Sequence, residues 1–195
     1  MNTIIKRIMS NKDFFEHALR ELIAKEDFQA LSSGRLKLHK VPGDTGGWTI
    51  GGVARRKNPS WPGWRLVDQG ERRLDVLMPY LSAFYRSRYW NVVRASDMPG
   101  NVAVPLFLLA VVAGIGRAAL SLQLAVGAQP DRRIGPKTLA AAKQMKEGRV
   151  LERMALAEVM FYRDLANRSR SRRKFFRGWI NRSTSHIDLS KTINL

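Results

Sequence analysis

The longest apolar stretch of the chain, Val102–Gly116, sets the strongest limit on what the sequence can fold into. It is too short to span a bilayer comfortably, and it contains Pro105 and Gly114. We therefore expect a helix buried in a protein core. The chain has 195 residues, 45% hydrophobic and 26% charged, and this is enough to bury such a core in one domain or two small ones.

Helical spacing of apolar residues continues on both sides of this stretch. Asn11 is a suitable N-cap, and the stripe that follows predicts a helix ending near Lys25. Helical patterning resumes over Arg72–Met78, and Pro79 suits the first turn of a further helix reaching about Trp90. A second long stripe predicts another helix, with one face formed by Val150, Met154, Ala157, Phe161 and Leu165.

The remaining segments place the breaks between helices. Ser32–Trp64 is rich in glycine, proline and polar residues, which favours a short β-hairpin or irregular loops. Ser96–Gly100 is the best candidate boundary, so we predict domains at residues 1–98 and 99–183. A last helix centres on Phe175–Ile180, and residues 184–195 form a tail. The predicted fold class is mainly α, with a small hairpin or loop region.

Charge and cysteine usage narrow the classes of function. The absence of cysteine excludes disulfides, a Cys-ligated zinc and a thiol nucleophile. The net charge of +18 implies a polyanionic partner: nucleic acid, an anionic membrane or an acidic cell-wall polymer. Residues 1–100 carry +7 and residues 101–195 carry +11. The dense basic block Arg163–Arg182 is either a binding surface or a solvated helix face and tail.

Three segments could carry chemistry. Glu26 follows the apolar stripe of the first helix, and a carboxyl beside apolar side chains suits a general acid; a solvated surface glutamate is the alternative. Pro42–Val53 holds four glycines in seven residues, which indicates unusual backbone angles, either in a plain hairpin turn or close to a ligand. It lacks the spacing of a phosphate-binding loop. The third segment, Leu122–Leu139, indicates two tightly joined helices.

In this order, the segments resemble glycoside hydrolase family 108 lysozymes with a C-terminal peptidoglycan-binding domain. That family includes phage endolysins and bacterial proteins once described as secretion activators. The resemblance covers residues 12–182, although Glu26 is followed here by Asp27 and Phe28 instead of two glycines, and Arg132 replaces a glycine. The matching positions are Asp44, Gly46, Gly47, Thr49 and Gly52, then Tyr89 and Trp90, Leu122–Thr138, and Phe175 or Phe176 with Gly178, Trp179 and Arg182.

The resemblance implies a lysozyme-like catalytic domain over residues 1–98 and a helical peptidoglycan-binding domain over residues 99–183. It implies a muramidase that cleaves the β-1,4 bond between N-acetylmuramic acid and N-acetylglucosamine, without metal or cofactor. Glu26 would be the general acid, and Thr49 with Asp44 would position the attacking water. Asp44 could equally fix the glycine turn through its own backbone. The implied substrate-binding residues are Gly46, Gly47, Trp48, Tyr89 and Trp90, with core packing as the alternative for Trp48.

The expected partner is bacterial peptidoglycan, with anionic outer-membrane lipids as a further partner for the basic C-terminal residues. We expect a monomer that binds no nucleic acid. Met1–Ser10 shows no secretory signal, so we expect synthesis in the host cytoplasm and action at the cell wall after release. Two alternatives stay open: a peptidoglycan-binding or secretion-related protein with little hydrolysis, and a basic nucleic-acid-binding protein.

Overall fold

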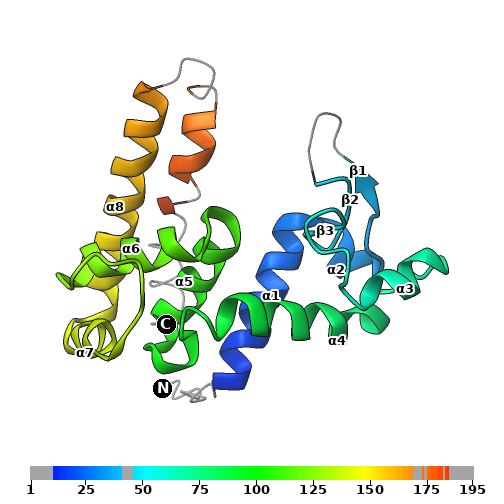
Figure 1. Cartoon of the computed structure of the whole chain (residues 1–195), viewed down its shortest axis with the longest axis horizontal. Coiled ribbons are helices and arrows are strands. Elements are labelled where there is room, and N and C mark those ends of the chain that lie inside the picture. The colour runs from blue at the N-terminus through cyan, green and yellow to red at the C-terminus, as the bar shows by residue number, and fades with distance from the viewer. Residues whose placement is uncertain (1–10, 41–45, 169–172, 174, 182, 185–195) are drawn as a thin grey trace, which may run out of the picture. The chain divides into compact units, whose positions relative to one another are not determined.

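A computed structural model of the chain describes residues 11–40, 46–168, 173, 175–181 and 183–184. The protein is mainly helical with a small three-stranded antiparallel sheet, which confirms the predicted fold class (Figure 1). The chain divides into an N-terminal unit, Met1–Arg88, and a C-terminal unit, Tyr89–Leu195. The predicted boundary after residue 98 stays a prediction. Within the described part of the chain, no helix is long and apolar enough to cross a membrane.

Helices α1 (Asn11–Glu26) and α4 (Leu74–Tyr85) pack together in the core of the N-terminal unit. Of the apolar stripe predicted for α1, Phe14 is only half-buried. The other five residues are buried as predicted: Phe15, Ala18, Leu19, Leu22 and Ile23. Two short helices, α2 (Ala30–Ser33) and α3 (Gly63–Asp68), pack on α1 and α4 respectively. Burial of the apolar face of each helix supplies the main stabilisation of this unit.

Pro79 lies inside α4, so the prediction that it opens a new helix was wrong. Proline removes one intrahelical hydrogen bond, but Pro79 is exposed, where water can satisfy the carbonyl left without its donor. The apolar spacing from Leu77 to Leu81 crosses the proline and keeps both sides of the helix on one core. After α4 the chain continues through a π-helical turn, Arg86–Trp90, and a 3₁₀ turn, Ala95–Asp97.

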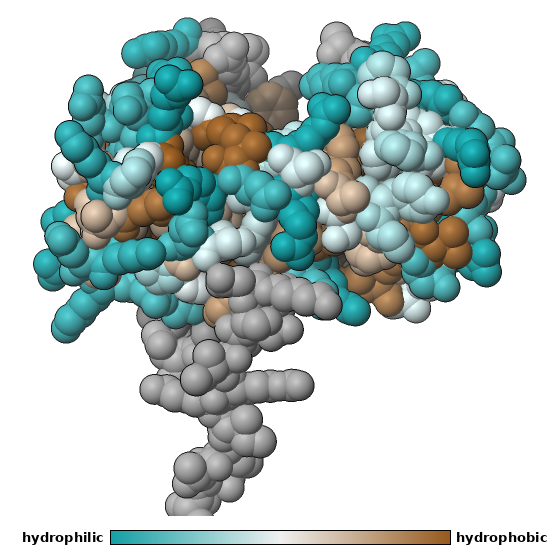
Figure 2. All heavy atoms as spheres, turned by 60° about the horizontal axis from the view of Figure 1, so that its bottom comes forward, coloured by the Kyte–Doolittle hydropathy of each residue, from teal (hydrophilic) through white to brown (hydrophobic). Residues whose placement is uncertain are grey.

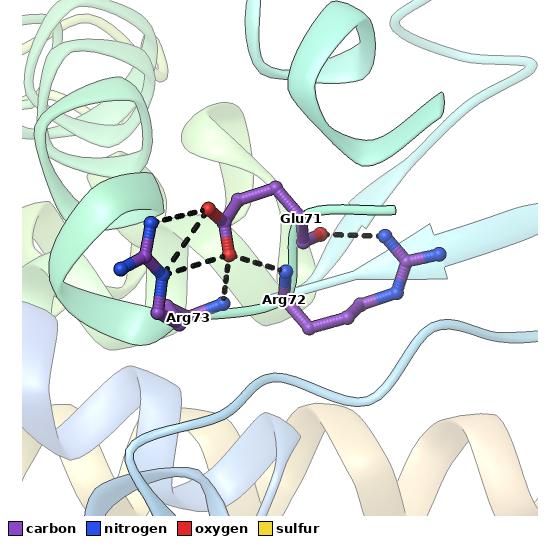
Figure 3. Close-up of polar contacts among 3 residues, drawn as sticks. All are labelled: Glu71, Arg72 and Arg73. Atoms are coloured by element: carbon purple, nitrogen blue, oxygen red, sulfur yellow. Dashed lines mark hydrogen bonds and ion pairs between the residues drawn. The ribbon is translucent and has the colours of Figure 1, made fainter. Parts of the chain in front are cut away.

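A compact polar cluster fixes the start of α4 (Figure 3). Glu71 Oε1 accepts hydrogen bonds from the backbone N–H of Arg72 (2.9 Å) and of Arg73 (2.8 Å). The Arg73 guanidinium pairs with the same carboxylate, and these hydrogen bonds lower the pKa of Glu71 to about 2. Arg35 pairs with Arg73 in an isolated β-bridge, so the segment leading toward the sheet is joined to the start of α4.

The sheet consists of β1 (His39–Lys40), β2 (Trp48–Ile50) and β3 (Val53–Ala54), with β2 in the centre. Thr49 pairs with His39 on one side and with Ala54 on the other. Gly51 and Gly52 connect β2 to β3 with φ of +52° and +78°. A two-residue hairpin with both angles positive is the turn that favours two glycines, so the hairpin alternative for the glycine-rich segment is confirmed.

The C-terminal unit is built on α5 (Gly100–Ala113), α6 (Ile115–Val126), α7 (Pro136–Gln144) and α8 (Glu147–Asn167). Every residue of α5 from Val102 to Ala110 is buried, which confirms the buried helix predicted from the apolar stretch. Helix α6 packs on both α5 and α8, and α8 lies alongside it in Figure 1. Gly114, with a φ of +93°, lets the chain turn directly from α5 into α6.

The buried face of α8 differs from the predicted stripe. Val150 and Met154 are buried as predicted, whereas Ala157, Phe161 and Leu165 are only half-buried. The face of α8 that is buried is rotated about the helix axis from the predicted one, so that it includes polar residues. The buried residues are Val150, Leu151, Met154, Ala155, Glu158, Tyr162 and Ala166. The spacing of apolar residues did not predict this face, because the buried residues include Glu158 and Tyr162. The Tyr162 ring stacks on Trp179 with centroids 5.0 Å apart, which holds helical residues 176–181 against α8.

Buried Gln123 of α6 organises the loop before α7. Its Nε2 donates to Asp131 Oδ1 (2.6 Å) and to the Arg133 carbonyl (3.0 Å), and its Oε1 accepts from Arg132 N–H (2.9 Å). Arg132 has a φ of +65°, a left-handed conformation that favours glycine. A glycine, which the family resemblance implies at this position, would adopt this conformation without strain.

Candidate active site

Glu26 and the glycine turn of the hairpin lie against each other. Glu26 is the last residue of α1 and is exposed. A Cβ atom added to Gly52 would lie 3.1 Å from Glu26 Cγ and 3.3 Å from Glu26 Cδ. The structure therefore brings together two of the three segments singled out in the sequence, and it places a carboxyl group beside the backbone of a tight turn.

Tyr85, at the end of α4, completes this arrangement from beneath the turn. Its ring is buried, and its hydroxyl donates a 2.8 Å hydrogen bond to the Gly51 carbonyl. A Cβ on Gly52 would collide with Tyr85 Oη, so only glycine fits between Tyr85 and Glu26. Tyr85 was not predicted as a site residue, because its helical spacing after Leu81 indicates only burial.

The two residues after Glu26 have separate roles in the structure. Asp27 Oδ2 accepts a 2.6 Å hydrogen bond from the backbone N–H of Lys37, which closes the loop between α1 and the sheet. Phe28 is 89% exposed. The departure from two glycines therefore supplies a loop-closing carboxylate and presents an aromatic face close in sequence to Glu26.

The predicted residues on β2 point in different directions. Trp48 is 48% exposed and Thr49 is half-buried. Neighbouring residues of a strand face opposite sides of the sheet. One sugar ring bound on one face of the sheet therefore cannot contact the side chains of both Trp48 and Thr49. Gly46 and Gly47 are buried just before β2, and the Gly46 carbonyl accepts a hydrogen bond from Arg56 N–H at 3.0 Å. Asp44 lies outside the described residues.

Tyr89 and Trp90 belong to the C-terminal unit. Tyr89 is half-buried. Trp90 is fully buried, its ring lies 5.6 Å from that of Phe107, and its Nε1 donates to Ser96 Oγ at 2.7 Å. The indole of Trp90 is a core element of its own unit in this structure, so direct contact with substrate stays a prediction for both residues.

The geometry of the Glu26 site suits acid–base chemistry on a bound ligand. An exposed carboxyl at a helix end can exchange a proton with an oxygen of a bound ligand. The exposure of Glu26 matches the surface glutamate that the sequence left open as the alternative, and not a carboxyl enclosed by apolar side chains. Among the described residues, no three His, Asp or Glu side chains gather where they could hold a metal ion.

Comparisons with known proteins agree with the order of these elements. Residues 34–114 match the family model described as Glycosyl hydrolase 108, and residues 117–184 match the model described as Predicted Peptidoglycan domain. The solved structure of SagA from Brucella abortus is similar, with a TM-score of 0.68 and 25% identity over 93% of this chain and 96% of that chain. No curated protein matches the chain significantly. The first matched range includes the glycine-rich segment and begins after Glu26.

Proposed function

Because the chain is a glycosyl hydrolase 108 domain followed by a predicted peptidoglycan domain, we propose that it is a muramidase. The first domain implies a glycoside hydrolase, and the second suggests that peptidoglycan is the polymer attacked. The bond proposed is the β-1,4 linkage between N-acetylmuramic acid and N-acetylglucosamine. The role proposed for the enzyme is that of a phage-type endolysin, which reaches the wall after release from the host cytoplasm.

Glu26 is the proposed general acid. Cleavage of a glycosidic bond needs a carboxyl that donates a proton to the leaving oxygen, and support for an oxocarbenium-like centre. The observation that carries this proposal is the contact of the exposed Glu26 side chain with the Gly52 backbone, within a turn held by Tyr85. That contact fixes a carboxyl beside the glycine-rich segment that belongs to the matched family range.

Thr49 is the residue proposed to position the attacking water, with Asp44 as its partner. Thr49 lies in the central strand, two residues before the turn that contacts Glu26. Its hydroxyl can both donate and accept a hydrogen bond, as a water-positioning group must. Trp48, exposed on the other side of the strand, is proposed to contact a neighbouring sugar.

Substitution of Glu26 by Gln tests the proposal, because glutamine keeps the size of the side chain and removes its acidic proton. We expect Glu26→Gln to fold normally and to release no soluble fragments from purified sacculi. Glu16→Gln, at another exposed position of α1, is the matched control and should hydrolyse at the wild-type rate. Mass analysis of the fragments should show N-acetylmuramic acid at the new reducing ends.

Three results would contradict parts of this proposal. Undiminished release by Glu26→Gln removes Glu26 from the mechanism. New reducing ends on N-acetylglucosamine, or anhydro ends, replace the proposed bond or reaction. Wild-type protein that sediments with sacculi but releases nothing is a peptidoglycan-binding protein without hydrolysis.

Positive charge supports binding to the anionic envelope. Arg163, Arg168, Arg173 and Arg177 are all exposed in the C-terminal unit, and the other basic residues of this block lie outside the described residues. Anionic outer-membrane lipids are the proposed secondary partner of these residues. Attraction between exposed charges weakens as salt shortens the screening length. Sedimentation with anionic vesicles should therefore decrease as the salt concentration increases.

A further inference from the structure

A groove of about 510 Å³ lies between α6 and α8 in the C-terminal unit. Leu124 of α6 and Leu156 and Met160 of α8 form an apolar wall, and all three are exposed, Leu156 by 59%. Figure 2 shows hydrophobic patches, in brown, within a largely hydrophilic surface. A concave surface of this size, with apolar walls and a few polar groups, is typical of ligand sites. We call it the α6–α8 groove.

Two guanidinium groups line the α6–α8 groove. Arg117 Nη2 donates to the Ala157 carbonyl at 2.8 Å, and Arg153 Nη1 donates to the Ala125 carbonyl at 3.2 Å. A guanidinium carries five N–H donors in a fixed plane, so each keeps donors for a carboxylate after this one bond. Within the described part of the chain, Arg117 Nε is buried without a hydrogen-bond partner. The acidic residue of the groove, Asp164, already pairs with Arg163 at 3.0 Å.

The lining favours a peptide over a glycan. Sugars bind on open aromatic faces and need many hydrogen-bonding partners. The aromatic ring in the groove, Phe161, has the Arg117 guanidinium 3.9 Å above it, so that face is covered. The other walls are aliphatic, which suits small apolar side chains such as the methyl group of alanine.

We propose that the α6–α8 groove binds the anionic stem peptide of peptidoglycan. Arg117 and Arg153 bind its carboxylates, and Leu124, Leu156 and Met160 contact its small apolar side chains. This inference rests on the proposed function, because it takes peptidoglycan as the ligand of residues 117–184. In this proposal the C-terminal unit recognises the stem peptide, and the N-terminal unit recognises the glycan.

Binding of a fluorescently labelled stem tetrapeptide to the full chain tests this proposal by anisotropy. Leu156→Glu keeps a helix-forming residue at an exposed position and places a negative charge in the apolar wall. We expect it to raise the Kd for the peptide about tenfold or more, a change of the size that lost apolar contact and like-charge repulsion produce. Gln129→Glu adds the same charge at an exposed position of the C-terminal unit outside the groove and should leave the Kd within about twofold.

The outcomes separate this inference from the proposed function. An equal Kd for Leu156→Glu and wild type, or no binding of the tetrapeptide by wild type, overturns the groove assignment. Competition by peptide-free chitooligosaccharides overturns it in favour of a glycan. A concentration-dependent dimer in sedimentation, abolished by Leu156→Glu, assigns the groove to a second copy of the chain. Loss of peptide binding in Leu156→Glu supports the groove even if Glu26→Gln retains hydrolysis, which contradicts only the proposed mechanism.

Discussion

Glu158 is a buried acid in the apolar face of α8, and its removal should change how stability depends on pH. Its side chain is 1% exposed, and its Oε1 has no hydrogen-bond partner within the described part of the chain. Burial raises the pKa of Glu158 from 4.5 to about 7, although a hydrogen bond with Ser183 and the charge of Arg117 act in the opposite direction. The test substitution is Glu158→Gln, which has nearly the same shape and does not titrate.

The sign and size of the effect follow from the two pKa values. Between pH 4.5 and about 7 the folded state binds more protons than the unfolded chain, in which this carboxyl titrates normally. Protonated Glu158 therefore contributes fully to the free energy of unfolding below pH 4.5, and this contribution is lost as the pH rises through about 7. At roughly 1.4 kcal/mol for each pH unit between the two values, the loss amounts to about 3 kcal/mol.

Urea denaturation followed by far-UV circular dichroism measures this loss. We expect the free energy of unfolding of wild type, relative to Glu158→Gln, to fall by about 3 kcal/mol between pH 4.5 and about 8. Glu152→Gln, at an exposed position of the same helix, is the control and should follow wild type at every pH. Parallel curves for wild type and Glu158→Gln would refute the assignment of a buried, neutral acid.

Two further substitutions test contacts within single units. Gly52→Ala should abolish hydrolysis of sacculi and lower stability by about 1–3 kcal/mol, because the new Cβ meets Tyr85 and Glu26 at a φ of +78°. Gly70→Ala has a φ of +90° but open space, so equal losses in both variants would contradict the contact argument. Gln123→Ala should cost about 2 kcal/mol in urea denaturation, because it leaves the loop before α7 without its buried partner; an unchanged midpoint would contradict that role.

The sequence predicted the parts of the fold that depend on neighbouring residues. Burial is confirmed for Val102–Ala110 and for most of the stripe of α1, because a continuous apolar run and apolar residues at helical spacing both report burial. Adjacent glycines at Gly51 and Gly52 indicated the hairpin because few other residues adopt two positive φ angles in succession.

Contacts between distant residues could not be predicted in the same way. The hydrogen bond from Tyr85 to Gly51 joins positions 34 residues apart, and that from Lys37 N–H to Asp27 closes a loop whose shape no periodic pattern specifies. The burial of Glu158 depends on the packing of α6 and the C-terminal helical residues against α8. From the sequence, a charged residue such as glutamate is expected to be exposed. For the candidate site, Glu26 was singled out by its place after the apolar stripe together with the family resemblance, and its role stays a prediction. Its contact with Gly52 required the three-dimensional structure.

Helix α5 is buried on all sides from Val102 to Ala110, and this has a consequence for biosynthesis. Its apolar residues surround the helix, and the elements that cover them in the C-terminal unit include α6 and α8. The last residue of α8, Asn167, is translated well after Ala113, on the order of several seconds later at ordinary rates of elongation. During that interval the apolar residues of α5 are exposed on the nascent chain. A ribosome-associated chaperone that shields apolar segments should therefore increase the fraction of chains with a correctly folded C-terminal unit more than the fraction with a correctly folded N-terminal unit.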